Sequence, residues 1–298
     1  MTGARILKPS CNLRYESGQF YETKASPTTS ECSKNAEYCW SCSDPSIESS
    51  TRSYSKNLNN LLSSISSNNI PNGFYNSSLG EYPNRVNVIA LCRGDIPEQN
   101  CTSCLNATSQ RLLENCPNKK EAIIWDELCM VRYSNNSIFS VKMDDPRLYL
   151  TSPTNATEPN QFKGVLTPLL ERLSSKASSG DSLKKFASGS DKVPGNETIY
   201  ATAQCTPDLD QQECANCLQE SVSSIPQCCD GKQGARVLKP SCNLRYEVNS
   251  FYVFANDSSE SQPSNSPESP PSNEGNKSKT GSVAIAVVLS VLVMLLVA

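Results

Sequence analysis

The sequence predicts an α+β fold made of two tandem, disulfide-stapled modules. Each module has two helices packed on an antiparallel β-sheet, and a C-terminal hydrophobic helix follows. A repeated cysteine spacing and a repeated helical pattern of leucines carry this prediction. A third observation is the cysteine content, 15 in 298 residues, which points to an oxidising compartment. A length near 300 fits about two domains of ordinary size.

The cysteine spacing defines the modules. The motif C-x8-C-x2-C occurs twice, with further cysteines after each copy. Its two copies comprise Cys92, Cys101 and Cys104, and Cys205, Cys214 and Cys217. A zinc site is the competing explanation for clustered cysteines. Because the spacing is unsuited to zinc and the chain has no histidine, we expect disulfides, with no metal and no cofactor.

Each module begins with a helical pattern. Apolar residues recur at i, i+3, i+4 and i+7, which places them on one face of a helix. They are Leu58, Leu61, Leu62 and Ile65 in the first copy and Leu166, Leu169, Leu170 and Leu173 in the second. Pro168 lies inside the second pattern and would strain a regular helix unless it stood in the first turn.

A second helix and several strands complete each module. The Cys101/Cys104 and Cys214/Cys217 pairs are predicted to open the second helices. Asp95 and Asp208, just before these helices, are interpreted as caps of a turn or helix start and not as catalytic acids. Apolar or alternating runs predict strands at residues 85–91, 122–125, 130–133 and 251–254.

Composition excludes many enzyme classes. Without histidine the chain cannot contain a Ser-His-Asp triad, a Cys-His dyad or a histidine general base. It has no Walker-type loop, no kinase signature and no dinucleotide fingerprint. Its net charge of −3 offers no general attraction to nucleic acid. We therefore expect no enzymatic activity and no nucleic-acid partner.

The N-terminal segment repeats the end of the second module. Residues 3–21 and 234–252 agree at 15 of 19 positions, around the shared stretch LKPSCNLRYE. Residues 1–21 are therefore interpreted as a fragment of a preceding module and 22–39 as a linker. Module one is expected at 40–148 and module two at 149–254. The N-terminus lacks the apolar region of a signal peptide, so secretion would require a leader that this chain does not carry.

The C-terminal end predicts attachment to a membrane. Residues 282–298 contain no charge, and at about 1.5 Å per residue they are just long enough to cross a bilayer core. The preceding residues, 255–281, are rich in Ser, Pro and Asn and are predicted to form an extended stalk. The hydrophobic segment is either a transmembrane helix or the signal for a glycolipid anchor.

Eight N-x-[ST] sequons support a secretory-pathway protein. The sequon at Asn100 is the weakest, because its neighbour Cys101 is expected to be bridged. The expected glycosylation sites are Asn76, Asn106, Asn135, Asn155, Asn196, Asn256 and Asn276.

These features resemble a known plant family. The C-x8-C-x2-C motif, the lead-ins LCRGD and QCTPDL, and the endings IIWDELCMVRYSN and GARVLKPSCNLRYE resemble the ginkbilobin-homologous domain, also called the stress-antifungal or salt-stress-response domain. The resemblance covers about residues 40–254 and the fragment 3–21. Two such domains, a stalk and a hydrophobic segment look like the ectodomain of a cysteine-rich receptor-like kinase or a cysteine-rich repeat secretory protein.

The resemblance implies three bridges per module. In this chain they would be Cys42–Cys116, Cys92–Cys101 and Cys104–Cys129 in module one, and Cys205–Cys214 and Cys217–Cys242 in module two. Module two lacks an N-terminal partner for a third bridge. Cys228 and Cys229 are therefore left over, with a vicinal pair as one option, and Cys11, Cys32 and Cys39 stay unassigned.

The resemblance also implies a candidate sugar site. The seed lectin of this family binds mannose through an Asn, an Arg and a Glu, and module two has Arg236 and Glu247 at two of these positions. A guanidinium and a carboxylate can hold vicinal hydroxyls by charge-assisted hydrogen bonds. The third position falls near Ser152, and module one has none of the three residue types. The alternative is that Arg236 and Glu247 form a surface ion pair.

Three functions stay open at this stage. The resemblance favours an extracellular ligand-binding ectodomain of a cysteine-rich receptor-like protein in stress or defence signalling, with the kinase absent from this chain. The alternatives are an antifungal mannose-binding lectin-like protein and a plasmodesmata-located interaction protein. The expected location is the apoplastic face of the plasma membrane. The expected partners are an apoplastic ligand, with carbohydrate as one candidate, other receptor-like ectodomains, and the membrane through the C-terminal segment.

Overall fold

The computed structural model describes residues 3–8, 11–16, 29–33, 37–43, 52–67, 70, 72–195 and 197–253. The expected stalk and the hydrophobic segment 282–298 lie outside these residues. None of the helices in these ranges is both long and apolar enough to span a bilayer. The N-terminal fragment contributes an antiparallel hairpin, with β1 (Gly3–Lys8) paired to β2 (Cys11–Glu16).

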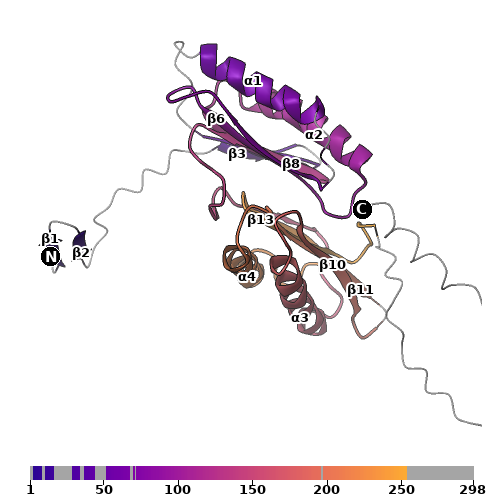
Figure 1. Cartoon of the computed structure of the whole chain (residues 1–298). Coiled ribbons are helices and arrows are strands. Elements are labelled where there is room, and N and C mark those ends of the chain that lie inside the picture. Colours follow the sequence, from indigo (N-terminus) through magenta and orange to yellow (C-terminus); the bar gives the residue numbers. More distant parts are fainter. Residues whose placement is uncertain are drawn as a thin grey trace, which may run out of the picture. The chain divides into compact units, whose positions relative to one another are not determined.

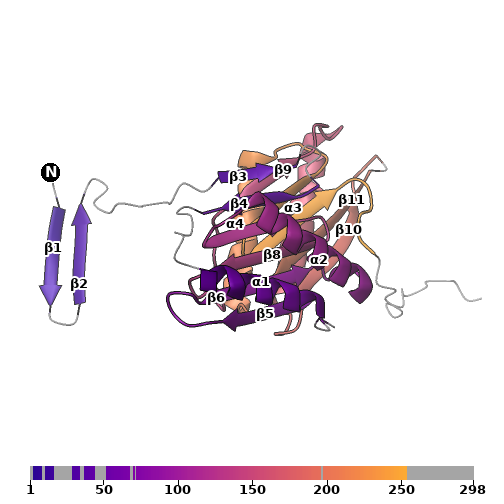
Figure 2. The ribbon, with the colours of Figure 1, turned by 90° about the horizontal axis from the view of Figure 1, so that it is seen from above.

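Module one is a six-stranded antiparallel sheet of order β3-β4-β7-β8-β6-β5. Its helices, α1 (Arg52–Ser67) and α2 (Glu98–Asn115), both lie over this sheet (Figures 1 and 2). The strands are β3 (Thr29–Cys32), β4 (Cys39–Cys42), β5 (Phe74–Leu79), β6 (Val86–Cys92), β7 (Glu121–Trp125) and β8 (Cys129–Ser134).

Module two repeats this plan with five antiparallel strands in the order β10-β11-β13-β12-β9. Helices α3 (Pro159–Ser178) and α4 (Gln211–Cys228) lie together over its sheet (Figure 1). The strands are β9 (Leu148–Thr151), β10 (Lys185–Lys192), β11 (Thr198–Cys205), β12 (Ala235–Leu238) and β13 (Cys242–Glu247). The predicted α+β fold of two tandem modules is confirmed.

The leucine patterns form the two module cores, as predicted. Leu58, Leu61, Leu62 and Ile65 of α1 are all buried. So are Leu166, Leu169, Leu170 and Leu173 of α3. Each such side chain stabilises the fold by about 1.5–3 kcal/mol relative to exposure. This burial fixes which face of each helix meets its sheet.

Pro168 is not in the first turn, contrary to the condition that the sequence suggested. It stands inside α3, which begins at Pro159 and continues past it to Ser178. The residue four positions earlier, whose carbonyl loses its helical partner, is Gly164, and both residues are exposed. Water can therefore satisfy that carbonyl, which lowers the cost of the proline.

The strand predicted at 251–254 is wrong for the residues that the structure describes there. Residues 251–253 follow β13 as an irregular segment. Their backbone groups form hydrogen bonds with side chains of module one and not with a neighbouring strand. The carbonyl oxygen of Phe251 accepts from Arg93 at 3.0 Å, and the amide of Val253 donates to Asp95 at 2.9 Å.

The sheet faces that carry no helices pack against each other. Because side chains alternate along a strand, β6, β7 and β8 bury one apolar set under the helices and present another on the opposite face. That second set includes Leu91, Trp125 and Met130, and it forms one buried cluster with Leu238 of β12. Leu148 and Leu150 of β9 pack against the same cluster. The two modules thus share a core, which we call the seam.

Seven disulfides cross-link the described residues. Five are the pairs that the family resemblance implies: Cys42–Cys116, Cys92–Cys101, Cys104–Cys129, Cys205–Cys214 and Cys217–Cys242. Two more assign cysteines that the sequence left open. Cys32 bonds Cys39 within the β3–β4 hairpin, and Cys228 bonds its neighbour Cys229 at the end of α4.

These bridges should differ greatly in their effect on stability. Cys42–Cys116 spans 74 residues, so its removal by Cys42→Ala with Cys116→Ala should lower the free energy of unfolding by about 4 kcal/mol. Cys228–Cys229 closes no chain loop, and the matched double alanine variant should lose only about 1 kcal/mol, from the burial of Cys229. Denaturant unfolding of the oxidised proteins measures both. Equal losses would contradict this ranking.

Candidate functional site

Arg236, the first of the two predicted sugar ligands, faces the seam. On β12 the neighbouring Ala235 and Val237 belong to the core under the helices, so Arg236 points to the opposite face. Its Nη2 donates to the backbone carbonyl oxygen of Asp126 in module one at 2.8 Å. The side chain is partly buried there. Module one therefore covers the first of the two residues for which the sequence predicts contact with a sugar.

The surroundings of Arg236 are crowded with charge. Burial, and after it the charge of Arg245, lowers the pKa of Arg236 to about 10, against the opposing attraction of Glu127 and Asp126. The guanidinium nevertheless stays protonated at neutral pH. Burial alone would raise the pKa of Glu127, but a hydrogen bond from Arg245 and the charges of the nearby arginines lower it overall. The site is thus an array of ionised groups at the edge of the seam.

Glu247, the second predicted ligand, contacts Arg245. Its Oε1 accepts from Arg245 Nε at 3.3 Å, and Arg245 Nη1 also donates to Glu127 at 3.0 Å. The Glu247 carboxylate lies so close to Gly234 that a Cβ at that position would overlap it. Glu247 is therefore paired with Arg245, and Arg236 is hydrogen-bonded to the backbone of Asp126. Sugar binding by this pair stays a prediction.

Arg93 and Asp95 of the LCRGD lead-in join the same array. Arg93 donates to Asp95 through Nε at 2.6 Å and Nη2 at 2.9 Å, and their side chains are only 10% and 3% exposed. The ring of Phe251 lies under the guanidinium of Arg245, with 4.1 Å between its centre and Cζ. The hydrogen bonds of Arg93 to Phe251 and of Val253 to Asp95 hold residues 251–253 on module one.

Asp95 and Asp208 both lie in turns, as the sequence suggested, but neither side chain caps a helix start. Asp95 holds Arg93 and the amide of Val253, and Asp208 accepts from the amide of Ser140 at 2.7 Å. The N-cap of α4 is Asp210, whose side chain accepts from the amide of Glu213, and α2 begins after Pro97 without a side-chain cap. Both aspartates instead connect segments that are distant in sequence.

A cavity of about 30 Å³ lies at the seam beside these groups. Its lining includes Arg93, Asp126, Arg236 and Gln204. This volume suits about one water molecule and is too small for a sugar ring. Among the residues that the structure describes, no group of three or more His, Cys, Asp or Glu side chains could hold a metal ion.

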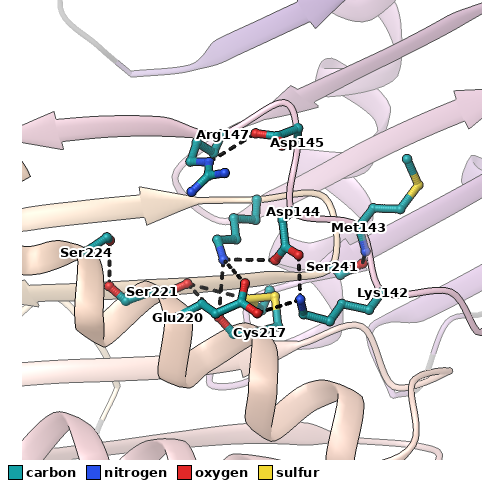
Figure 3. Close-up of polar contacts among 12 residues, drawn as sticks. Lys142, Met143, Asp144, Asp145, Arg147, Cys217, Glu220, Ser221, Ser224 and Ser241 are labelled. Carbon is teal, nitrogen blue, oxygen red and sulfur yellow. Dashed lines mark hydrogen bonds and ion pairs between the residues drawn. A yellow bond between two sulfur atoms is a disulfide. The ribbon is translucent and has the colours of Figure 1, made fainter. Parts of the chain in front are cut away.

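A second charged cluster fastens the segment between the modules. Lys142 and Asp144 from that segment meet Glu220 of α4 (Figure 3). Lys239, whose side chain is 1% exposed, donates to Asp144 at 2.9 Å and to Glu220 at 3.4 Å. Ser241 accepts from the amide of Met143 at 2.8 Å (Figure 3). We call Lys142, Asp144, Glu220 and Lys239 the linker clamp.

The linker clamp shifts the pKa values of its members. Burial alone would raise the pKa of Asp144, but hydrogen bonds from Lys142 and Lys239 lower it overall. Burial alone would lower the pKa of Lys142, but its hydrogen bonds to Asp144 and Glu220 raise it overall. The signal for Lys239 was present in the sequence, since it belongs to the LKPSC stretch that recurs at Lys8. Its partners, 95 and 19 residues away, gave no such signal.

Comparisons with known proteins identify the family. A family model described as salt stress response/antifungal matches residues 38–136 and 150–249. The chain belongs to this family. The matched ranges correspond to the two modules, each with its sheet and pair of helices. The relatives of the chain include a secretory protein, an antimicrobial protein and a receptor-like protein kinase.

Three relatives illustrate the range of the salt stress response/antifungal family. The chain is 40% identical to cysteine-rich repeat secretory protein 38 of Arabidopsis thaliana, over 74% of this chain and 88% of that protein. It is 39% identical to the antimicrobial ginkbilobin-2-like protein of Castanea crenata, over 70% of this chain and 90% of that protein. It is 38% identical to cysteine-rich receptor-like protein kinase 26 of Arabidopsis thaliana, over 82% of this chain but only 39% of the kinase.

Solved structures share the tandem fold. The tandem DUF26 ectodomain of the Arabidopsis thaliana cysteine-rich receptor-like protein PDLP8 matches with a TM-score of 0.62 at 22% identity, over 70% of this chain and 96% of that chain. The corresponding ectodomain of PDLP5 matches with a TM-score of 0.57 at 25% identity, over 70% and 98%. The fold of this family member is therefore that of a tandem DUF26 ectodomain.

The expected glycosylation sites fall into three groups. Asn76, Asn106 and Asn155 are exposed, as is the disfavoured Asn100, while Asn135 is half-buried. Asn155 Oδ1 accepts from Lys232 at 2.8 Å. Asn196, Asn256 and Asn276 lie outside the described residues.

The seam should be sensitive to a single added methyl group. Gly94 lies against Phe186 of module two, and a Cβ at Gly94 would overlap that side chain. We expect Gly94→Ala to lower the free energy of unfolding by about 1–3 kcal/mol through overpacking. The matched control is Gly164→Ala in α3, where a Cβ would meet nothing within 4 Å and the change should be neutral or stabilising. Denaturant unfolding followed by the fluorescence of buried Trp125 measures both, and equal effects would contradict the seam contact.

The linker clamp should make stability depend on pH. Because the folded-state pKa of Asp144 is lowered, its ionisation stabilises the fold above the ordinary Asp range, about pH 4, and this contribution disappears as pH falls through the lowered pKa. We expect Asp144→Asn to be less stable than the wild type at neutral pH and to lose less stability in acid. Unfolding at several pH values measures this, with the exposed Glu114→Gln as a charge-matched control. Parallel pH profiles for wild type and Asp144→Asn would contradict it.

Proposed function

We propose that this protein is a non-enzymatic extracellular recognition ectodomain that acts in stress or defence signalling. The observation that carries the proposal is the seam, because it joins two family modules through the sheet faces that their helices leave open. A single unit with both helical layers turned outward suits recognition by its helices, loops and sheet edges. The secreted and receptor-like relatives support the extracellular setting.

The charged edge of the seam supports a role in recognising a partner. It does not support a sugar-cleaving site or a deep sugar pocket. Arg236 already bonds module one, and its cavity is too small for a sugar ring. Phosphorylation activity is not proposed, since the chain spans only 39% of the length of the kinase relative. Membrane attachment through residues 282–298, and pairing with other receptor-like ectodomains, form part of this proposal.

Competition at the cell surface tests the proposal. We expect the purified chain, produced behind an added leader, to reduce the early stress response of plant cells to a fungal cell-wall extract, because it competes with receptors for their ligand. Chain that has been reduced and alkylated is the control and should have no effect. An unchanged response over a wide protein concentration range would contradict the recognition role, and turnover of the extract would indicate an enzyme.

A second candidate function is direct antimicrobial action. It is favoured by the 39% identity to the antimicrobial ginkbilobin-2-like protein. Growth inhibition of a fungus by the purified chain, without plant cells present, separates this candidate from receptor-type recognition.

Mannose binding tests the sugar mechanism of that candidate. We expect no binding tighter than about millimolar, since Arg236 is engaged by Asp126 and a weak site needs only about −4 kcal/mol to reach that range. Titration calorimetry with the full chain measures it. Micromolar binding that Glu247→Ala abolishes and Glu114→Gln leaves intact would favour the lectin-like function instead.

A further inference from the structure

Module two contains a cavity of about 240 Å³ between α3 and α4, whose lining does not include Arg236. Its buried lining comprises Phe162, Leu166, Leu170, Cys229 and Tyr246, and its partly exposed lining includes Val222 and Ile225. Phe162 and Tyr246 form a tilted aromatic pair with ring centres 6.2 Å apart. A concave, mainly apolar cavity with a few polar groups at its mouth is the usual form of a small-molecule site.

The cavity lies where module one has a disulfide. Cys116 and Cys229 hold equivalent places, since each follows the second helix of its module as the C-cap. Cys116 bonds Cys42 of β4, which pairs with Ala122 of β7. In module two the corresponding strand position, paired with Ala235, is Thr151.

Cys229 accordingly forms its disulfide with its neighbour Cys228 and not with a strand of the sheet. The packing of the helix differs in the same region. Leu112 of α2 is fully buried, whereas its counterpart Ile225 of α4 is only partly buried. The end of α4 is therefore not fastened to β9, which leaves space between the helices.

The mouth of the cavity has an excess of positive charge at one end. Lys163 pairs with Asp230 at 3.5 Å, while the described partner of Lys232 is the neutral amide oxygen of Asn155. Two ammonium groups therefore meet one carboxylate at this end. Glu171, which also lines the cavity, stands eight residues beyond Lys163 on α3, or about 12 Å along the helix.

The backbone around the mouth is held in place. The amide of Ala156 donates to the carbonyl of Gly231 at 2.8 Å, and the amide of Gln233 donates to the carbonyl of Thr154 at 3.1 Å. A site that is already ordered loses little entropy when a ligand binds. Lys232 lies within this fixed segment.

We propose that the cavity binds a small carboxylic acid with one aromatic ring, the ring lying between α3 and α4 and the carboxylate at Lys232. The volume supports this size, because a cavity of about 150 Å³ holds benzene and 240 Å³ therefore suits about ten non-hydrogen atoms. The aromatic and aliphatic lining suits the ring. The unbalanced ammonium group suits the carboxylate by a charge-assisted hydrogen bond.

Two probes test the proposal with the full chain: phenylacetate, and its uncharged analogue 2-phenylethanol. We expect saturable binding of phenylacetate by titration calorimetry and ligand-observed NMR, with weaker binding of the alcohol. Lys232→Gln should weaken phenylacetate by about tenfold and leave 2-phenylethanol unchanged. The exposed Lys192→Gln, outside the cavity, is the matched control and should change neither.

Filling the cavity tests the location. Val222→Phe should abolish binding of both probes, and Thr167→Leu on the opposite wall is a second filling variant in case the first does not fold. The absence of saturable binding to the wild type would overturn the proposal. So would undiminished binding in a folded filling variant, or equal effects of Lys232→Gln and Lys192→Gln. None of these outcomes bears on the cell-surface competition test, so the proposed function is tested independently of the cavity.

Discussion

Everything in this structure depends on covering the second face of each sheet. Each module of this chain has two helices, and both lie on the same side of its sheet. The other side presents apolar groups such as Trp125 and Leu238, which would be costly to leave in water. Packing the two exposed faces together removes both from solvent at once. Trp125 also finds a partner for its indole nitrogen across the seam, in the backbone carbonyl of Lys239 at 3.2 Å.

The seam explains the position of the partly buried charged side chains. Its centre is apolar, and its edge is lined by arginines and carboxylates that pair with one another or with backbone carbonyls. Arg236 and Arg93 are two examples, each bonded to a segment of the other module. Partly buried charges of this kind stabilise one arrangement of the modules in preference to others, because a displaced module would leave them without partners. The linker clamp does the same for the chain that connects the modules, with Lys239 as its most buried member.

Local sequence patterns predicted the helices and strands, but they did not predict contacts between residues that are distant in sequence. The spacing of Leu166, Leu169, Leu170 and Leu173 predicted a helix face because periodicity is a local property. The direction in which Arg236 points was not predictable, since it depends on which sheet face the other module covers. The same holds for Asp95, which a local interpretation treated as a cap. The sequence already showed that module two lacks the partner that Cys42 provides in module one, but it offered the Cys228–Cys229 bond only as one option.

The different cross-linking of the two modules has a mechanical consequence. In module one a covalent bond from Cys42 joins strand β4 to the end of α2, so a pull on that strand is transmitted to the helix. Strand β9 of module two carries no cysteine and is held to β12 by hydrogen bonds over four residue pairs. Under tension, β9 would thus peel from its sheet at a lower load than β4, its counterpart in module one. The two modules should therefore differ in mechanical resistance, and the less resistant one is module two, which contains the cavity.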